Sequence, residues 1–246
     1  MRVRKSLLGF AAALSMATAP ASAQEAGQGE GEQALGQFRA AVAQMRALML
    51  RAGEPVTGWD QGGADPDADT RAAGADRFYQ LNTSVDGTGV AILTDRPIRD
   101  FAPAGWRVVD SYGTADEALD QPQVDFMPFS ERYVMAARSR SWRQNDANCY
   151  RDLNHALLYE VPGAAAGADD ATVPMMFRMM ILALEGETIC VRTDGDRQAG
   201  YRTRYFLSDG RPLPELTDAN SLTTIVPAAP VAELIRAAPP RRTTTD

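Results

Sequence analysis

Residues 32 to 52 carry apolar side chains at helical spacing. Alternate steps of three and four residues place these side chains along one narrow stripe of a helix. The stripe consists of Leu35, Phe38, Val42, Met45 and Met49. Gly53 and Pro55 follow and end the pattern, so we expect an amphipathic helix over 32–52. The stripe either packs on the chain's own domain or pairs with another helix, which leaves self-association through residues 35–49 open.

Between residues 77 and 228 the pattern changes to short apolar segments separated by glycine-bearing turns. RFYQLNTSV and VAIL flank the turn signal DGTG, GWRVVDSYG predicts a further strand, and YRTRYFL another. The apolar run 171–184 and the segment 187–195 predict two strands joined at Glu185 and Gly186. TADEALDQ, with Thr114 as its cap, predicts a short helix. These elements favour an antiparallel meander.

The predicted fold class is therefore α+β. We expect one domain over 77–228 whose antiparallel sheet packs against the N-terminal amphipathic helix, with one disulfide. A flexible start (24–31) precedes the helix, and an acidic Gly- and Asp-rich linker (53–76) follows it. A C-terminal helical turn and tail (229–246) end the chain.

The linker holds acidic residues at alternate positions, a spacing shared with calcium-binding loops. These residues are Asp65, Asp67 and Asp69, with Asp76 at the twelfth place. Thr70 stands where such a loop needs glycine, and the last ligand is not the longer Glu. A solvated acidic linker is the better interpretation, and we assign no metal site.

The stretch DANCYRDLNHALLYE (146–160) brings Cys149 and the single histidine, His155, within six residues. Read as a helix, it turns Cys149 toward the core with Leu153 and Leu157 and turns His155 toward water. Read as a strand, it still need not bring the two side chains together. Neither interpretation favours a Cys–His catalytic pair.

The first 23 residues have the pattern of a bacterial signal peptide: a basic start, a short apolar run and the cleavage motif ASA. We expect cleavage after Ala23 and a periplasmic or secreted protein with no transmembrane segment after cleavage. Removal of Arg2, Arg4 and Lys5 changes the net charge from −7 to −10. So acidic a chain has no electrostatic reason to bind nucleic acid.

Lys5 is the only lysine, so the mature chain has none. Schiff-base chemistry, Walker A loops and S-x-x-K nucleophiles are thereby excluded. One histidine likewise cannot supply H-E-x-x-H or a three-histidine zinc site. We assign no cofactor.

Two cysteines in an exported chain are most simply one disulfide, Cys149–Cys190. His155 with Asp152, or an unidentified pair of carboxylates, leaves a hydrolase as the alternative function. In YRTRYF, alternation places Tyr201, Thr203 and Tyr205 on one face and two arginines on the other, which we read as a solvent face. No catalytic residue is assigned. The sequence favours a non-catalytic exported protein that binds a small ligand or an envelope partner.

Overall fold

The computed structural model describes residues 27–72, 78–83, 87–94, 96–113, 123–167, 170–217, 222–226, 229 and 231–233. The predicted signal peptide, the predicted helix at Thr114, Asp76 and most of the C-terminal tail lie outside these ranges. Three α-helices are described: α1 (Gly27–Met49), α2 (Pro66–Ala72) and α3 (Val173–Leu184). Two 3-10 helices accompany them, η2 (Ile98–Phe101) and η3 (Asp170–Thr172).

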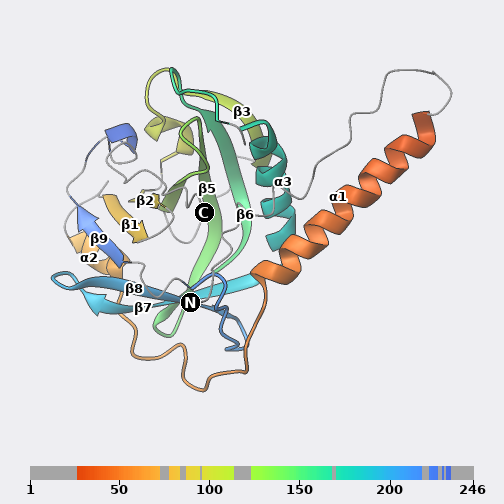
Figure 1. Ribbon diagram of the computed structural model, residues 1–246. Coiled ribbons are helices and arrows are strands. Elements are labelled where there is room, and N and C mark those ends of the chain that lie inside the picture. Colours follow the sequence, from red (N-terminus) through yellow and green to blue (C-terminus); the bar gives the residue numbers. More distant parts are fainter. Residues whose placement is uncertain are drawn as a thin grey trace, which may run out of the picture.

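Nine antiparallel strands form the sheet. They are β1 (Phe78–Thr83), β2 (Gly87–Leu93), β3 (Arg107–Gly113), β4 (Gln123–Pro128), β5 (Tyr133–Gln144), β6 (Ala147–Glu160), β7 (Thr188–Asp196), β8 (Gly200–Leu207) and β9 (Leu222–Val226). Their order is β3-β6-β5-β4-β2-β1-β9-β8-β7, and β7 also pairs with β6. The sheet therefore closes into a ring of eight strands, with β3 added beside β6 (Figure 1). The predicted α+β class with an antiparallel sheet is confirmed.

Closure of the ring depends on the length of β6. Its first residues, 147–151, pair with β7, whereas residues 155–160 pair with β3. On its other side β6 pairs with β5 over its whole length, with a bulge near Ser139. One long strand thus belongs both to the ring and to the extension that carries β3.

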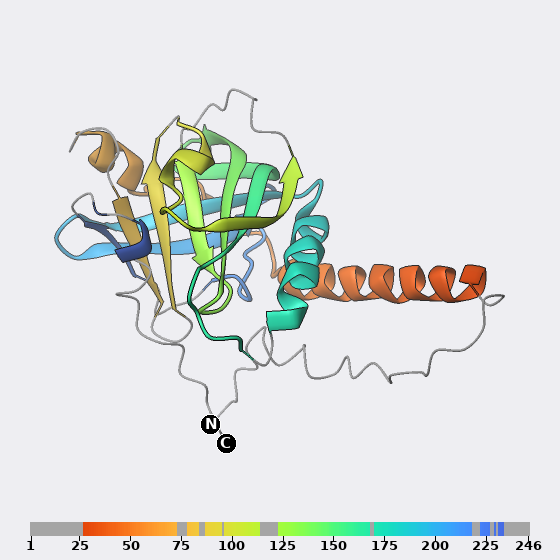
Figure 2. The same ribbon diagram turned by 90° about the horizontal axis from the view of Figure 1, so that it is seen from above.

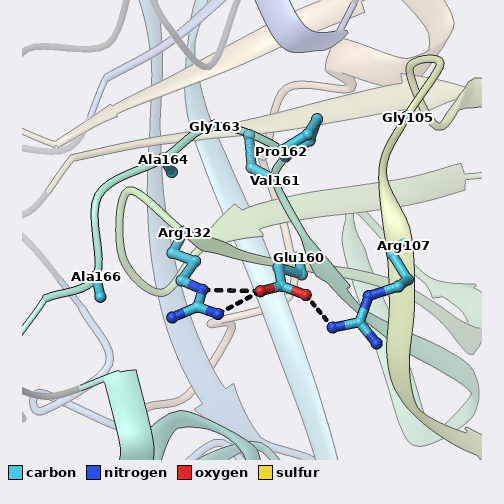
Figure 3. A pocket seen from close by; sticks show the side chains of 9 residues that line it. All are labelled: Gly105, Arg107, Arg132, Glu160, Val161, Pro162, Gly163, Ala164 and Ala166. Carbon is cyan, nitrogen blue, oxygen red and sulfur yellow. Dashed lines mark hydrogen bonds and ion pairs between the residues drawn. The ribbon is translucent and has the colours of Figure 1, made fainter.

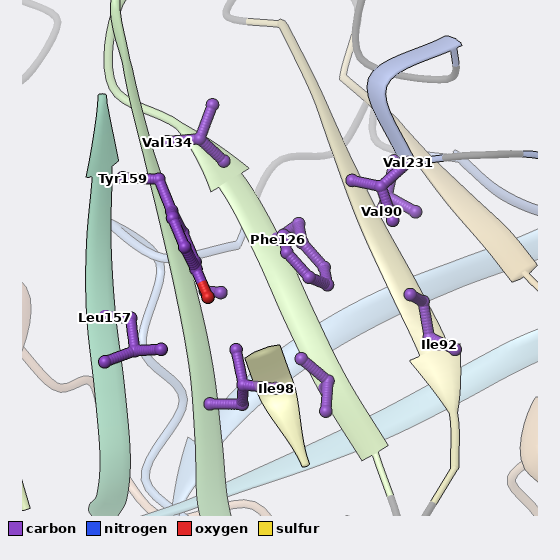
Figure 4. Close-up of a cluster of buried hydrophobic side chains, with 10 residues drawn as sticks. Val90, Ile92, Ile98, Phe126, Val134, Leu157, Tyr159 and Val231 are labelled. Atoms are coloured by element: carbon purple, nitrogen blue, oxygen red, sulfur yellow. The ribbon is translucent and has the colours of Figure 1, made fainter. Parts of the chain in front are cut away.

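The outer face of the sheet is apolar and covered. Alternate residues of four neighbouring strands meet there, and Ile98 of η2 and Val231 pack on top of them (Figure 4). The strand residues of this cluster are Val90, Ile92, Val124, Phe126, Val134, Ala136, Leu157 and Tyr159. Full burial of each large side chain contributes roughly 1.5 to 3 kcal/mol, so this cluster fixes the strands that carry the site described below.

Helix α3 corrects one sequence prediction. Residues 173–184 form a helix, where we expected a strand. The helix begins with Pro174 in its first turn, a position where proline's fixed φ favours a helix. Its buried Phe177 and Ile181 pack on Met135 and Leu158, on the face of β5 and β6 that is opposite the outer cluster.

Helix α1 forms as predicted and begins five residues earlier, at Gly27. Its C-terminal end runs beside α3, while its N-terminal part projects beyond the rest of the described chain (Figures 1 and 2). Burial follows that arrangement: Leu35 is 48% exposed, whereas Met49 is 8% exposed. The predicted stripe therefore packs on its own domain only at its C-terminal end.

The predicted disulfide is present. Cys149 and Cys190 face each other across the β6–β7 pairing with their sulfur atoms 1.99 Å apart. Both cysteines are fully buried beside Trp59 and Phe206, whose rings stack at 5.0 Å. The disulfide therefore joins the two strands at which the ring closes.

Candidate functional site

The inner face of the ring carries polar side chains. Asp125 of β4 lies opposite Ala91 of β2 and Ala137 of β5, so these three residues share one face. Gln123, two residues earlier, lies on the same face and donates a hydrogen bond from Nε2 to Asp125 Oδ1 at 2.8 Å. A carboxylate thus projects from the face that is opposite the outer apolar cluster.

Two tyrosines on other strands of the ring interact with Asp125, one from β6, which is separated from β4 by β5, and one from β8, which is opposite β4. Tyr150 on β6 and Tyr205 on β8 belong to strands that are not neighbours of β4 in the ring. Burial raises the pKa of both phenols, and the charge of Asp125 raises each further. Because groups on separate strands interact through space, the face that they share must be the inside of the ring.

The environment of these groups is enclosed but not fully packed. Asp125, Tyr150 and Tyr205 each retain part of their surface accessible to water. Burial nevertheless dominates their titration, and it raises the pKa of Asp125 to about 6. Because these polar groups lie on the inner face of the ring and remain partly accessible, we treat this polar interior as the candidate site.

Helix α2 lies close to the polar interior and corrects the linker prediction. Asp65 Oδ1 caps the helix by accepting hydrogen bonds from the amides of Asp67 and Ala68, each at 3.1 Å. Asp67 is 4% exposed. Burial is the main cause of the raised pKa of Asp125; the hydrogen bond from Gln123 lowers this pKa, and the charge of Asp67 raises it. The predicted acidic linker is thus partly a helix that contributes a second carboxylate.

Helix α2 also contacts β8 on the same inner face. The Tyr201 hydroxyl donates a hydrogen bond to Asp69 Oδ2, and burial followed by this bond raises the pKa of Tyr201. Of the three alternating acids, Asp65 therefore caps the helix, Asp67 is buried, and Asp69 accepts a hydrogen bond from a tyrosine. Among the residues that the structure describes, no group of three or more acidic, cysteine or histidine side chains is arranged to hold a metal ion.

Thr223 of β9 adds an unsatisfied hydroxyl. It pairs with Tyr201, which places its side chain on the inner face, and it is 2% exposed. Within the described part of the chain, its Oγ1 has no hydrogen-bond partner. A buried hydroxyl left unpaired costs about 1 to 3 kcal/mol, so the interior retains capacity for a polar group.

Two arginines near this interior are paired with acidic side chains. Arg204 on β8 points outward and pairs with Asp194 of β7 at 2.6 Å, as expected for the solvent face predicted from YRTRYF. Arg143 shares the inner face but pairs with Asp65 at 3.6 Å, beside α2. The groups around Asp125 are therefore acidic, phenolic or neutral.

A separate surface pocket of about 370 Å³ lies between β3, β5 and the end of β6. Its charged groups satisfy one another, because Arg132 donates to Glu160 Oε1 from Nε at 2.8 Å and Arg107 pairs with the other oxygen (Figure 3). Hydrogen bonds from Arg132 and then Arg107 lower the pKa of Glu160. Since the pocket's charges are already paired, it is the weaker candidate.

His155 lies on strand β6, so of the two interpretations of residues 146–160 the strand is the correct one. His155 is 7% exposed and does not face water, as the helix interpretation would have required. Cys149 is bonded to Cys190 and stands six residues away along β6, roughly 20 Å at about 3.3 Å per residue. A Cys149–His155 pair is therefore excluded. The side chain of Asp152 lies outside the described part of the structure, so its role with His155 stays a prediction.

Comparison with protein-family models, curated proteins and solved structures finds no match for this chain. Among the described helices, none is long and apolar enough to span a membrane. The function must therefore be argued from the polar interior itself.

Sequence reasoning did not identify Asp125, Tyr150 or Tyr205. The segment QVDFMP carried a usable signal, since Gln123 and Asp125 alternate with Val124 and Phe126. Such alternation indicates a strand with one polar face. It does not say whether that face meets water or the inside of a ring, because the closure depends on pairing between distant segments.

Proposed function

We propose that the chain is an exported, non-catalytic binding protein that takes a small organic ammonium ion into its polar interior. The observation that carries this proposal is Asp125, a carboxylate on the inner face of the ring whose pKa is raised to about 6 by burial and also by the charge of Asp67. Burial raises the pKa of Tyr150 and Tyr205, and the charge of Asp125 adds to that rise. A buried charge is costly unless a partner of opposite sign compensates it. A cationic ligand supplies that partner.

The class of ligand follows from the groups that face it. Carboxylates attract a cation, and an aromatic ring such as that of Tyr150 or Tyr205 carries a negative quadrupole that favours an alkylammonium group. The unsatisfied Thr223 hydroxyl suits a ligand that also carries a polar group. An anion would be repelled by the two carboxylates Asp125 and Asp67.

The proposal includes export of the chain, which the Cys149–Cys190 disulfide supports. The predicted leader carries the chain out of the cytoplasm, and the Cys149–Cys190 disulfide suits an oxidising compartment. Periplasm and external medium both meet that condition.

Calorimetric titration with tetramethylammonium and choline tests the ligand class, with the uncharged tert-butyl analogue of choline as the matched control ligand. We expect the cations to bind and the neutral analogue not to bind at pH 7.5. Binding should weaken as the pH falls through about 6, because Asp125 then takes up a proton. Asp125→Asn should abolish binding.

Glu131→Gln is the matched variant, since it removes one exposed carboxylate outside the site. It should bind as the unmodified protein does. Equal affinity for choline and its neutral analogue, or no binding of any cation tested, would refute the proposed ligand class.

The second candidate function is a hydrolase that uses a carboxylate pair. Burial and also the charge of Asp67 raise the pKa of Asp125 to about 6, and a carboxyl group with a raised pKa near a second carboxylate suits a general acid and its partner. A panel of chromogenic glycosides tests this alternative. Turnover that is lost in both Asp67→Asn and Asp125→Asn would favour it, and ligand binding without turnover would favour the binding protein.

A further inference from the structure

The projecting part of α1 presents an apolar strip that the domain does not cover. Leu35 is 48% exposed and Phe38 is half-buried, while Gly36 between them faces open space. Farther along, Arg46 donates from Nη1 to the carbonyl of Glu185 at 3.2 Å and pairs with Glu187. These contacts anchor the C-terminal end of α1 and leave the strip around Leu35 and Phe38 available.

Charges flank this strip at heptad spacing. If Leu35 and Phe38 are positions a and d, then Glu32, Arg39 and Arg46 are all position e. Glu32 and Arg39 are both exposed. The same edge of the helix is therefore acidic toward its N-terminus and basic toward its C-terminus.

We propose that a second copy of this chain docks antiparallel on α1, with Leu35 of each helix against Phe38 of the other. In an antiparallel pair, the e edge of one helix runs beside the e edge of its partner. The register that joins Leu35 to Phe38 also places Glu32 of each copy beside Arg39 of the other, which gives two equivalent ion pairs.

The charge pattern selects this arrangement over its competitors. In a parallel pair the e edge faces position g, where Ala34 and Ala41 offer no charge. A shift of the antiparallel register by one heptad sets the two Arg39 side chains beside each other, which is repulsive. The two-fold antiparallel register alone pairs opposite charges, and its closed symmetry limits the assembly to a dimer.

Sedimentation equilibrium of the mature protein from ~1 μM to ~1 mM tests the proposal, because an interface of about two heptads predicts a weak dimer in that range. Arg39→Glu should raise the dissociation constant about tenfold, since it replaces two attractive pairs with two repulsive ones. Glu32→Arg should do the same. The double variant Glu32→Arg/Arg39→Glu exchanges the charges and should restore the affinity.

Arg197→Glu is the matched control, because it makes the same charge change on the exposed β7–β8 turn. It should leave the dissociation constant unchanged, and circular dichroism should show the same helix content in all variants. A chain that stays monomeric throughout, or a dimer that ignores both single reversals, overturns the proposal. A dimer that the double variant fails to restore overturns the antiparallel register.

Discussion

Replacement of Asp125 by asparagine should stabilise the folded chain at neutral pH. The carboxyl group is costly because burial raises its pKa from 3.8 to about 6. That rise corresponds to about 3 kcal/mol of unfavourable free energy once the group is ionised in the folded state. Asparagine keeps the shape and still accepts the hydrogen bond from Gln123, so it should recover most of this free energy.

The effect should depend on pH with a definite sign. Below pH 3.8 the acid is protonated in both the folded and the unfolded chain, so the variant gains nothing. Between pH 3.8 and about 6 the folded state binds the proton more tightly, and stability of the unmodified protein falls as the pH rises. Above that window the full difference of about 3 kcal/mol should appear.

Urea unfolding at pH 3.5, 5 and 7.5 measures this difference when it is run in parallel on the unmodified protein, Asp125→Asn and the control Glu131→Gln. The control should show no comparable pH-dependent gain. A variant that is destabilised at pH 7.5, or that gains the same free energy at all three pH values, would refute the reasoning. A stabilising variant that loses choline binding would indicate that Asp125 is retained for its ligand at the expense of stability.

Three further predictions concern the disulfide, the packing of α3 and the glycine beside Trp59. Reduction, or replacement of Cys149 and Cys190 together by serine, should lower the free energy of unfolding by about 4 kcal/mol, which urea unfolding with and without reductant measures. Phe177→Ala should cost about 3 to 5 kcal/mol and loosen α3, seen as faster amide exchange in that helix. Gly210→Ala should cost about 1 to 3 kcal/mol in thermal unfolding, because φ at this glycine is +85° and a Cβ would lie 2.5 Å from the Trp59 ring.

Local patterns predicted the parts of the fold that depend on local physics. The stripe from Leu35 to Met49 predicted α1, and the alternation in YRTRYF predicted which side chains of β8 face outward. Compartment and cysteine count predicted the disulfide. Each inference needed only spacing or composition, and no knowledge of distant partners.

The secondary structure of α3 was predicted wrongly, and that of β6 was left open, because burial on most sides removes the alternation of apolar and polar residues. Helix α3 is apolar over most of its circumference, and a short apolar run does not distinguish a helix from a buried strand. In β6, both faces are covered between residues 155 and 160, and the bulge beside His155 breaks the alternation. The resulting spacing of Cys149, Leu153 and Leu157 imitates a helix.

The candidate site was out of reach for a related reason. Asp125, Tyr150 and Tyr205 lie on three strands and come together only because β7 returns to pair with β6. The sequence placed Asp67 in a solvated linker because the composition of 53–76 is rich in Gly and Asp. In the structure Asp65 caps α2, and this short helix buries Asp67. Long-range pairing, which sequence spacing does not encode locally, creates the polar interior.

The ring of paired strands has a consequence for how the protein behaves when it is concentrated. Each strand of the ring has partners on both sides over at least part of its length, whereas β3 pairs, among the described strands, with β6 alone and is an edge strand. A bulge between Val108 and Asp110 interrupts the pairing of β3 with β6, and Arg178 of α3 donates a hydrogen bond from Nε to the Asp110 carboxylate at 2.8 Å. Bulges and charges of this kind deter another chain from adding a strand. At this edge strand, Asp110→Val would remove the ion pair with Arg178 and should favour the addition of a strand from another chain, and thereby polymerisation.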